Sequence, residues 1–211
     1  MSVLIINGTE YPDVPIPSAM MDAPPLKSVY VDNPGGNGRH DLSTALTDGN
    51  PVFDNIPLSF GLRFPDGDFF ALQREWNSKY HGKVVKVTTD DQKDLYLEGR
   101  CTLSGWTRNP HSVSVMFNVN AGPYWYEKKE TVVTASASAN PGTTVTLSNG
   151  RLWVMPVITP SQAMEIMYAG TLYQVQKGAQ IIPGIMLKDG DSTLQLIGEG
   201  DCELRFRRGW L

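Results

Sequence analysis

Alternating apolar and polar residues indicate β-strands along most of the chain. In Leu58–Phe64 every second residue is leucine or phenylalanine, which places these side chains on one face of a half-buried strand. A polar turn at residues 90–94 separates residues 83–89 from a second alternating run at residues 95–103, and this order predicts a β-hairpin. Further strands are expected around Leu4–Asn7, Lys27–Val31, Val113–Val119 and Cys202–Phe206.

One segment has a helical period instead. Its large apolar residues recur at steps of three or four, at Phe69, Leu72, Trp76 and Tyr80, the spacing that gathers side chains on one face of an α-helix. Asp68 is a good N-cap, and Gly82 suits the position just beyond the helix end. The pattern predicts a helix over residues 68–81 that lies against a sheet. His81 is interpreted as a residue that caps the last carbonyls.

The second half of the chain is divided into short runs by frequent turn signals, a spacing typical of a β-sandwich. Small and hydroxylic residues gather in Thr131–Thr146, which favours a domain boundary near residue 130. The sequence therefore predicts a mainly β protein with two β-sandwich-like domains, residues 1–130 and 131–211, and one α-helix flanking the N-terminal sheet. Within the second domain, Asn149-Gly150 predicts a tight hairpin turn.

Charge and composition exclude several classes of function. The 211 residues contain 22 acidic and 18 basic side chains, a net charge of −4, so no broad positive field favours specific nucleic-acid binding. No secretory leader or membrane-spanning run is recognisable, and we expect no membrane association. Cys101 and Cys202 lie in alternating registers and are expected to be buried thiols without a chemical role.

Candidate chemistry is sparse. Gly35-Gly36-Asn37-Gly38 lacks the Lys-Ser/Thr pair of a phosphate-binding loop, and His40-Asp41 has no partner serine in a nucleophile elbow. Three histidines and two cysteines are scattered, so no metal site is predicted. The acidic turns at residues 90–91 and 189–191 do not follow a calcium-loop pattern and are interpreted as solvated turns. We expect no catalytic residue, no cofactor and no enzymatic activity.

Two groups of side chains are candidates for contacts with partners. The first is an outward-facing row of arginines near the C-terminus, which favours either an interface or protection of a terminal strand from edge-to-edge pairing; its members are Arg205, Arg207 and Arg208. The second is a set of aromatic residues, including Trp125 and Trp153, which would suit sugar stacking in a carbohydrate-binding module or packing within the fold.

The segment from Val29 to Leu46 carries a more specific pattern. Its residues Pro34-Gly35, Asn37-Gly38 and Asp41-Leu42 resemble a motif of the distal tail (Dit) proteins of siphophages, in which Pro-Gly-x-Asn-Gly is followed after two residues by Asp-Leu-Thr. Ser43 stands where that family has threonine, so the hydroxyl is retained. The order of elements to about residue 126 is also similar to this family, whereas the C-terminal part carries no sharp motif.

This resemblance implies a structural role in a virion. Distal tail proteins form a hexameric ring at the tail tip, with one face on the tail-tube protein, the other on the tail-tip hub protein, and a channel through which DNA passes. We accordingly expect homo-hexamers in which Val29–Leu46 contributes to the ring interface. The alternatives are a carbohydrate-binding β-sandwich for host recognition and a tail-tube subunit, which would share the β-rich fold but lack the motif.

Overall fold

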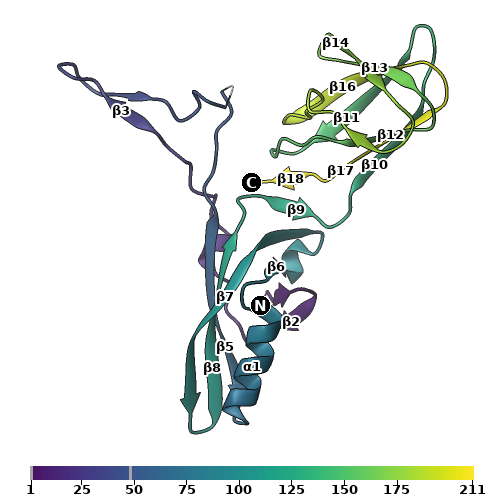
Figure 1. Ribbon diagram of the computed structural model, residues 1–211. Helices are drawn as coiled ribbons and strands as arrows, with labels where there is room; N and C mark the ends of the chain where they lie inside the picture. Colours follow the sequence, from purple (N-terminus) through teal and green to yellow (C-terminus); the bar gives the residue numbers. More distant parts are fainter. Residues whose placement is uncertain (1, 48) are drawn as a thin grey trace. The chain divides into compact units, whose positions relative to one another are not determined.

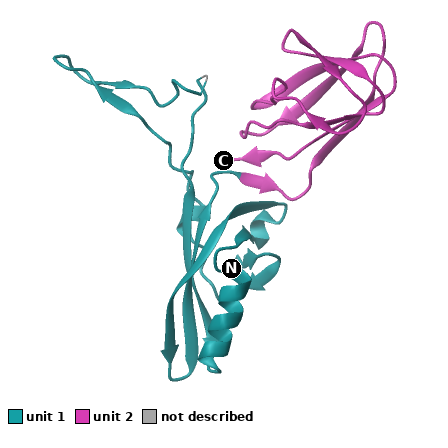
Figure 2. Ribbon diagram, viewed as in Figure 1, with its two compact units in different colours: residues 1–124, 211 teal, residues 125–210 magenta. Residues whose placement is uncertain are grey.

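The computed structural model describes residues 2–47 and 49–211 and divides into two compact units, residues 1–124 with residue 211, and residues 125–210 (Figure 2). The chain is mainly β, with one α-helix and several antiparallel sheets, so the predicted fold class is confirmed. The strand Trp125–Glu127 belongs to the second unit, which puts the division slightly before the predicted boundary near residue 130.

In the first unit, six strands pair as part of one antiparallel sheet, and two others form a separate hairpin (Figure 1). The sheet order is β5-β8-β7-β6-β1-β2. Its strands are β1 (Leu4–Ile6), β2 (Thr9–Tyr11), β5 (Ile56–Pro65), β6 (Val84–Thr89), β7 (Leu95–Asn109) and β8 (Ser112–Ala121); the hairpin is β3 (Tyr30–Asp32) with β4 (Arg39–Asp41), and two short 3-10 helices span Ser18–Met20 and Asp90–Gln92.

The predicted helix is α1, which spans Phe69–Tyr80. Asp68 caps its N-terminus, since the carboxylate accepts a hydrogen bond of 3.0 Å from the amide of Ala71. Gly82 follows with φ +74°, the left-handed conformation that glycine adopts most easily. The expected capping role of the His81 side chain is wrong, because its Nδ1 accepts a hydrogen bond from the amide of Leu103 in β7.

α1 packs against the sheet through aromatic contacts. The Trp76 ring lies 4.5 Å from Phe64 of β5 and 5.8 Å from Phe117 of β8, measured between centroids. Tyr80 is fully buried and lies 5.3 Å from the same Phe117. Burying side chains of this size contributes about 2–3 kcal/mol each, so these contacts hold the helix on the sheet.

A β-bulge changes the direction of side chains near the end of β7. Ser104 pairs with Met116 and Thr107 with Ser114, so two residues of β7 lie opposite one residue of β8. Gly105 takes φ +62°, as expected of a residue that opens such a bulge. The bulge turns Trp106 to the helix side of the sheet, where its ring meets Phe69 at 6.2 Å.

The acidic turn between β6 and β7 holds the N-terminal segment. The carboxylate of Asp90 accepts a hydrogen bond of 2.6 Å from the amide of Val3, and the Asp90 amide donates to the Val3 carbonyl. Asp91 accepts a hydrogen bond from the hydroxyl of Ser2. The interpretation of residues 90–91 as a solvated turn missed this structural role.

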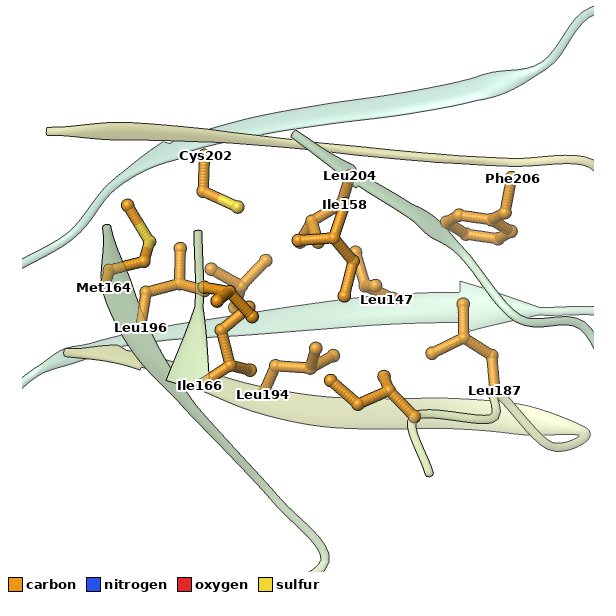
Figure 3. Packing of buried hydrophobic residues seen from close by; sticks show 13 residues of the cluster. Leu147, Ile158, Met164, Ile166, Leu187, Leu194, Leu196, Cys202, Leu204 and Phe206 are labelled. Carbon is orange, nitrogen blue, oxygen red and sulfur yellow. The ribbon is translucent and has the colours of Figure 1, made fainter. Parts of the chain in front are cut away.

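The second unit is a sandwich of two four-stranded antiparallel sheets, ordered β10-β17-β12-β15 and β11-β16-β13-β14. Side chains from both sheets, including Leu147, Ile158 and Leu204, fill the space between them (Figure 3). The strands of the two sheets are β10 (Thr131–Ser136), β11 (Thr143–Asn149), β12 (Val157–Pro160), β13 (Met164–Tyr168), β14 (Thr171–Val175), β15 (Gln180–Ile181), β16 (Gly190–Ile197) and β17 (Asp201–Phe206). Two further short strands, β9 (Trp125–Glu127) and β18 (Gly209–Trp210), pair with each other.

The hairpin predicted at Asn149-Gly150 is wrong. Asn149 ends β11, which pairs with β16 rather than with the segment that follows it. Its buried side chain donates hydrogen bonds to the carbonyls of Leu152 and Leu187, at 2.7 and 3.1 Å. Asn149 thus links the end of β11 to the segments that contain Leu152 and Leu187. The dipeptide Asn149-Gly150 alone does not indicate this role.

Candidate assembly interface

The hairpin β3–β4 is the centre of a long uncovered segment. Every residue from 25 to 42 is exposed, and the strands pair only with each other among the described residues. The segment begins and ends beside the sheet, where the amide of Lys27 donates to the carbonyl of Val52 at 2.8 Å and Leu26 forms a β-bridge with Phe53. We call residues 26–47 the arm (Figure 1).

The predicted motif residues lie at the two ends of this hairpin. Pro34, Gly35, Asn37 and Gly38 form its tip, and Gly35 and Gly38 take φ +80° and +82°. Glycine adopts positive φ values more easily than other residues, which explains why these two positions of the tip are glycines. Asp41 and Leu42 lie at the other end, next to the sheet-proximal part of the arm. The first half of the motif therefore forms the turn of the hairpin, and the second half lies at its base.

Asp41 and Ser43 organise the base of the hairpin. The carboxylate of Asp41 accepts a hydrogen bond of 2.9 Å from the amide of Ser43, and the Ser43 hydroxyl accepts one of 2.8 Å from the amide of Val29. Hydrogen bonds from Ser43 lower the pKa of the Asp41 carboxyl. The Ser43 hydroxyl therefore links the two sides of the hairpin at its base.

Several apolar side chains of the arm have no cover. Val29, Tyr30, Val31 and Leu42 are 44–53% exposed, and Leu46 is 99% exposed. A two-stranded hairpin is marginally stable in water on its own, and gathered exposed apolar groups usually mark a contact surface. These properties make the arm the strongest candidate for an assembly interface in the first unit.

The arginine row is held by partners within the second unit. Arg208 pairs with Glu127 at 3.0 Å, and Arg205 pairs with Glu203 at 2.5 Å. Arg207 donates to the carbonyls of Glu127 and Lys128 and pairs with Glu130. The contacts of Arg207 and Arg208 connect the end of β17 to the β9 segment, whereas the pair formed by Arg205 and Glu203 lies within β17. Arg205, Arg207 and Arg208 remain a proposed interface, although each now has an intramolecular role.

The aromatic candidates for sugar stacking lie in separate environments. The Lys188 ammonium lies over the Trp153 ring, 4.7 Å from the ring centroid. Trp125 of β9 lies opposite Trp210 of β18 in the pairing of these two strands. A hollow of about 300 Å³ lies elsewhere in this unit and is lined partly by Glu165 and Gln174, which are hydrogen-bonded to each other. Neither tryptophan lines that hollow, so the two rings and the hollow do not form one sugar-binding site.

The remaining chemistry-bearing residues are dispersed. Among residues 2–47 and 49–211, no three histidine, cysteine or acidic side chains are close enough to hold a metal ion. Cys101 and Cys202 are fully buried, and burial raises the pKa of each thiol to about 11. The described part of the chain has no helix of the length and apolarity needed to cross a bilayer.

Comparison with known proteins identifies a similar structure but no similar sequence family. No protein-family model and no curated protein matches the chain. The crystal structure of the Dit protein (gp 19.1) of phage SPP1, described as a paradigm of the hub adsorption apparatus in phages that infect Gram-positive bacteria, aligns with a TM-score of 0.58. The alignment covers 98% of this chain and 99% of that one at 14% identity. Both units therefore have the fold of a distal tail protein.

Sequence analysis located the motif but missed the extent of the uncovered segment. The apolar residues Val29 and Val31 alternate with polar neighbours as they would in a half-buried strand, and nothing in that pattern separates a strand covered by its own chain from one left for a partner. The density of turn residues between them and Leu42 indicates a hairpin, but it does not indicate whether other strands cover that hairpin.

Proposed function

We propose that this protein is a distal tail protein, a structural component of a phage tail tip. Six copies form a ring that connects the tail tube to the hub and host-recognition apparatus and leaves a channel for DNA. In this proposal its partners are further copies of itself, the tail-tube protein and the hub protein, and it is part of the virion. The role requires no catalysis and no cofactor.

The arm is the observation that carries the proposal. It exposes apolar side chains over a continuous stretch and places the distal-tail-like motif at its tip and base. A subunit that acts alone gains nothing from such a segment, because an uncovered hairpin costs conformational entropy and risks aggregation. A subunit that contacts its neighbour by two different surfaces forms a closed ring when the rotation allows it.

The similarity to the SPP1 protein supports the same proposal over both units. It extends across nearly the full length of each chain, so both units of this chain take part in the alignment. Fold alone does not fix function. The motif and the exposed arm, which are features of a particular surface, supply the functional part of the argument.

The experiment replaces the two tip glycines, Gly35→Val together with Gly38→Val. Both take positive φ, where a β-branched residue is strained, although a Cβ at either position would meet no atom. We expect the tip to deform and oligomers to be lost. The matched control is Gly170→Val with Gly178→Val, which imposes the same kind of strain in the second unit, at φ +80° and +104°. Oligomers that survive the arm substitutions would contradict the proposed role of the motif.

A further inference from the structure

Asparagine is followed by glycine at three places in the chain, Asn7-Gly8, Asn37-Gly38 and Asn149-Gly150. In such a pair the side-chain amide reacts readily with the backbone, because glycine has no Cβ to hinder the approach of its own nitrogen to the asparagine Cγ. The reaction needs a backbone that moves freely, since the nitrogen must turn toward the side chain. The surroundings of each pair therefore determine whether it reacts.

Two of the three pairs are held in place by the fold. Asn149 is buried, its side-chain amide donates to carbonyls of neighbouring segments, and a Cβ on Gly150 would meet the carbonyl oxygen of Gly209 at 2.4 Å. Asn7 is exposed, but its backbone amide donates to the carbonyl of Lys86 at 2.9 Å, and its side-chain oxygen accepts from the amide of Lys86 at 2.8 Å. Both pairs react only after a local opening that breaks these contacts.

The third pair, Asn37-Gly38, is exposed and unrestrained. Among residues 2–47 and 49–211, no side chain or backbone group forms a hydrogen bond with the Asn37 side chain. The Gly38 amide, which is the reacting nitrogen, has no backbone acceptor in the same described residues. Gly38 takes φ +82°, and nothing lies within 4 Å of the position that a Cβ would occupy. The pair therefore has both the space and the freedom that the reaction needs.

The hairpin around this pair restrains it little. Asp32 and Arg39 are the last paired residues before the tip, and their side chains form an ion pair of 2.8 Å. Residues 33–38 form the loop beyond that pair, in which the Gly36 amide donates to the Asn33 carbonyl at 3.1 Å. A two-stranded hairpin is marginally stable in water. The loop therefore reaches reactive geometries without the opening that the other two pairs require.

We propose that Asn37 is a site of spontaneous deamidation, with water as the co-reactant. The Gly38 nitrogen loses its proton and attacks the side-chain Cγ of Asn37. A bond between this nitrogen and Cγ forms, the bond from Cγ to the side-chain nitrogen breaks, and ammonia leaves with the proton. Water then opens the five-membered imide at one of its two carbonyls, which gives either aspartate or isoaspartate. Both products carry a carboxylate, so the tip gains one negative charge.

Deamidation changes the tip in both charge and shape. It places a carboxylate two residues before Arg39, which already pairs with Asp32. In isoaspartate the main chain runs through the side chain of residue 37, which lengthens the turn by one carbon. The altered residue lies inside the motif of residues 34–42. Stored protein therefore becomes a mixture whose tips differ, whether or not copies assemble into a ring.

Rates of deamidation in the folded and the urea-unfolded full-length protein test the inference. In urea the three pairs are unstructured and should react at similar rates. In the folded protein, we expect Asn37 to stay within about threefold of its unfolded rate, because its local opening costs almost nothing. Asn7 and Asn149 should slow about tenfold or more, since about 1.4 kcal/mol of opening free energy is one factor of ten. Peptide mapping by mass spectrometry follows all three sites in one sample, and isoaspartate methyltransferase labels the isoaspartate.

Asn33 provides a matched control at the same tip. It is exposed as Asn37 is, but Pro34 follows it, and a proline nitrogen has no proton to lose, so Asn33 should stay unchanged. In Asn37→Gln the longer side chain forms a ring far more slowly, and the acidic species seen by ion-exchange chromatography should disappear. Acidic species that persist in this variant, or an Asn37 slowed as much as Asn149 in the folded protein, overturn the inference. The mass of the protein is measured separately, so either outcome leaves the proposed function standing.

Discussion

The amide of Leu42 donates a hydrogen bond of 2.8 Å to the carbonyl of Val29, and this bond closes a hairpin in which both residues are nearly half exposed. Elsewhere in the first unit, paired strands place leucine, valine and phenylalanine against α1. In the arm, the same residue types face water. The first unit therefore contains two kinds of β-structure. The strands of the sheet bury their apolar side chains in a core, whereas the hairpin leaves its apolar side chains exposed.

Polar substitutions in the arm should separate assembly from folding. We expect Val31→Ser with Leu42→Ser to change the free energy of unfolding of the protomer by less than about 0.5 kcal/mol, because neither side chain is in the core. Self-association should weaken about tenfold or more. Light scattering and urea unfolding measure the two quantities. The control, Leu172→Ser, alters a similarly exposed leucine in the second unit and should leave association unchanged.

Loss of the Trp76 ring should destabilise the first unit. Trp76→Ala removes the contacts with Phe64 and Phe117, and a large-to-small change of this kind costs about 3 kcal/mol or more. Glu75→Ala, on the exposed side of the same helix, should have an effect below about 0.5 kcal/mol. Urea denaturation followed by circular dichroism provides the comparison. Equal effects of the two variants would show that α1 is not held by this aromatic cluster.

Asn149 should be a stabilising residue of the second unit. Asn149→Ala removes the side-chain donor to the carbonyl of Leu152 and one of the two donors to the carbonyl of Leu187, which also accepts from the amide of Val154, and this should cost about 1–2 kcal/mol. The neighbouring Ser148 is exposed, so Ser148→Ala is a suitable control with little expected effect. Thermal unfolding of both variants decides the question. A turn-forming role for Asn149 would instead predict that Asn149→Gly is as stable as the original protein.

Sequence periodicity predicted most of the sheet and the helix because these elements form against a core of the same chain. The alternation in Leu58–Phe64 and the spacing of Trp76 and Tyr80 both record burial, and the structure places those residues as expected. Asn149-Gly150 misled the prediction because its signal is local, whereas the pairing of β11 with β16 spans about 40 residues. Local turn preference was outweighed by long-range pairing.

The candidate interface was only partly predictable for a different physical reason. The turn chemistry of Gly35 and Gly38 is encoded locally, so the tip was found. β5 pairs with β8 alone because of the order of the strands in the whole sheet. No local feature of Ile56–Pro65 indicates how many strands pair with it. Pro57 and Pro65 are the one sequence signal that points to an edge strand, and their meaning becomes clear once β8 is known to be the partner.

The buried thiols should make stability depend on alkaline pH. The pKa of Cys101 and Cys202 is raised from 9.0 to about 11 by burial, so between these values the unfolded state binds fewer protons than the folded state. Stability is then fully present below pH 9 and decreases as pH rises toward 11. Urea unfolding at several pH values should show a smaller decrease for Cys202→Ala than for the original protein. Identical slopes would contradict a contribution from Cys202.

The absolute mass of the purified protein across a concentration series, with electron microscopy of the largest species, tests the central claim most directly. A ring of six 23.3 kDa subunits, about 140 kDa, with an open centre is the predicted result. A protein that remains a 23.3 kDa monomer at every concentration, and still does so when the arm is intact and the tail-hub partner is supplied, would contradict the account.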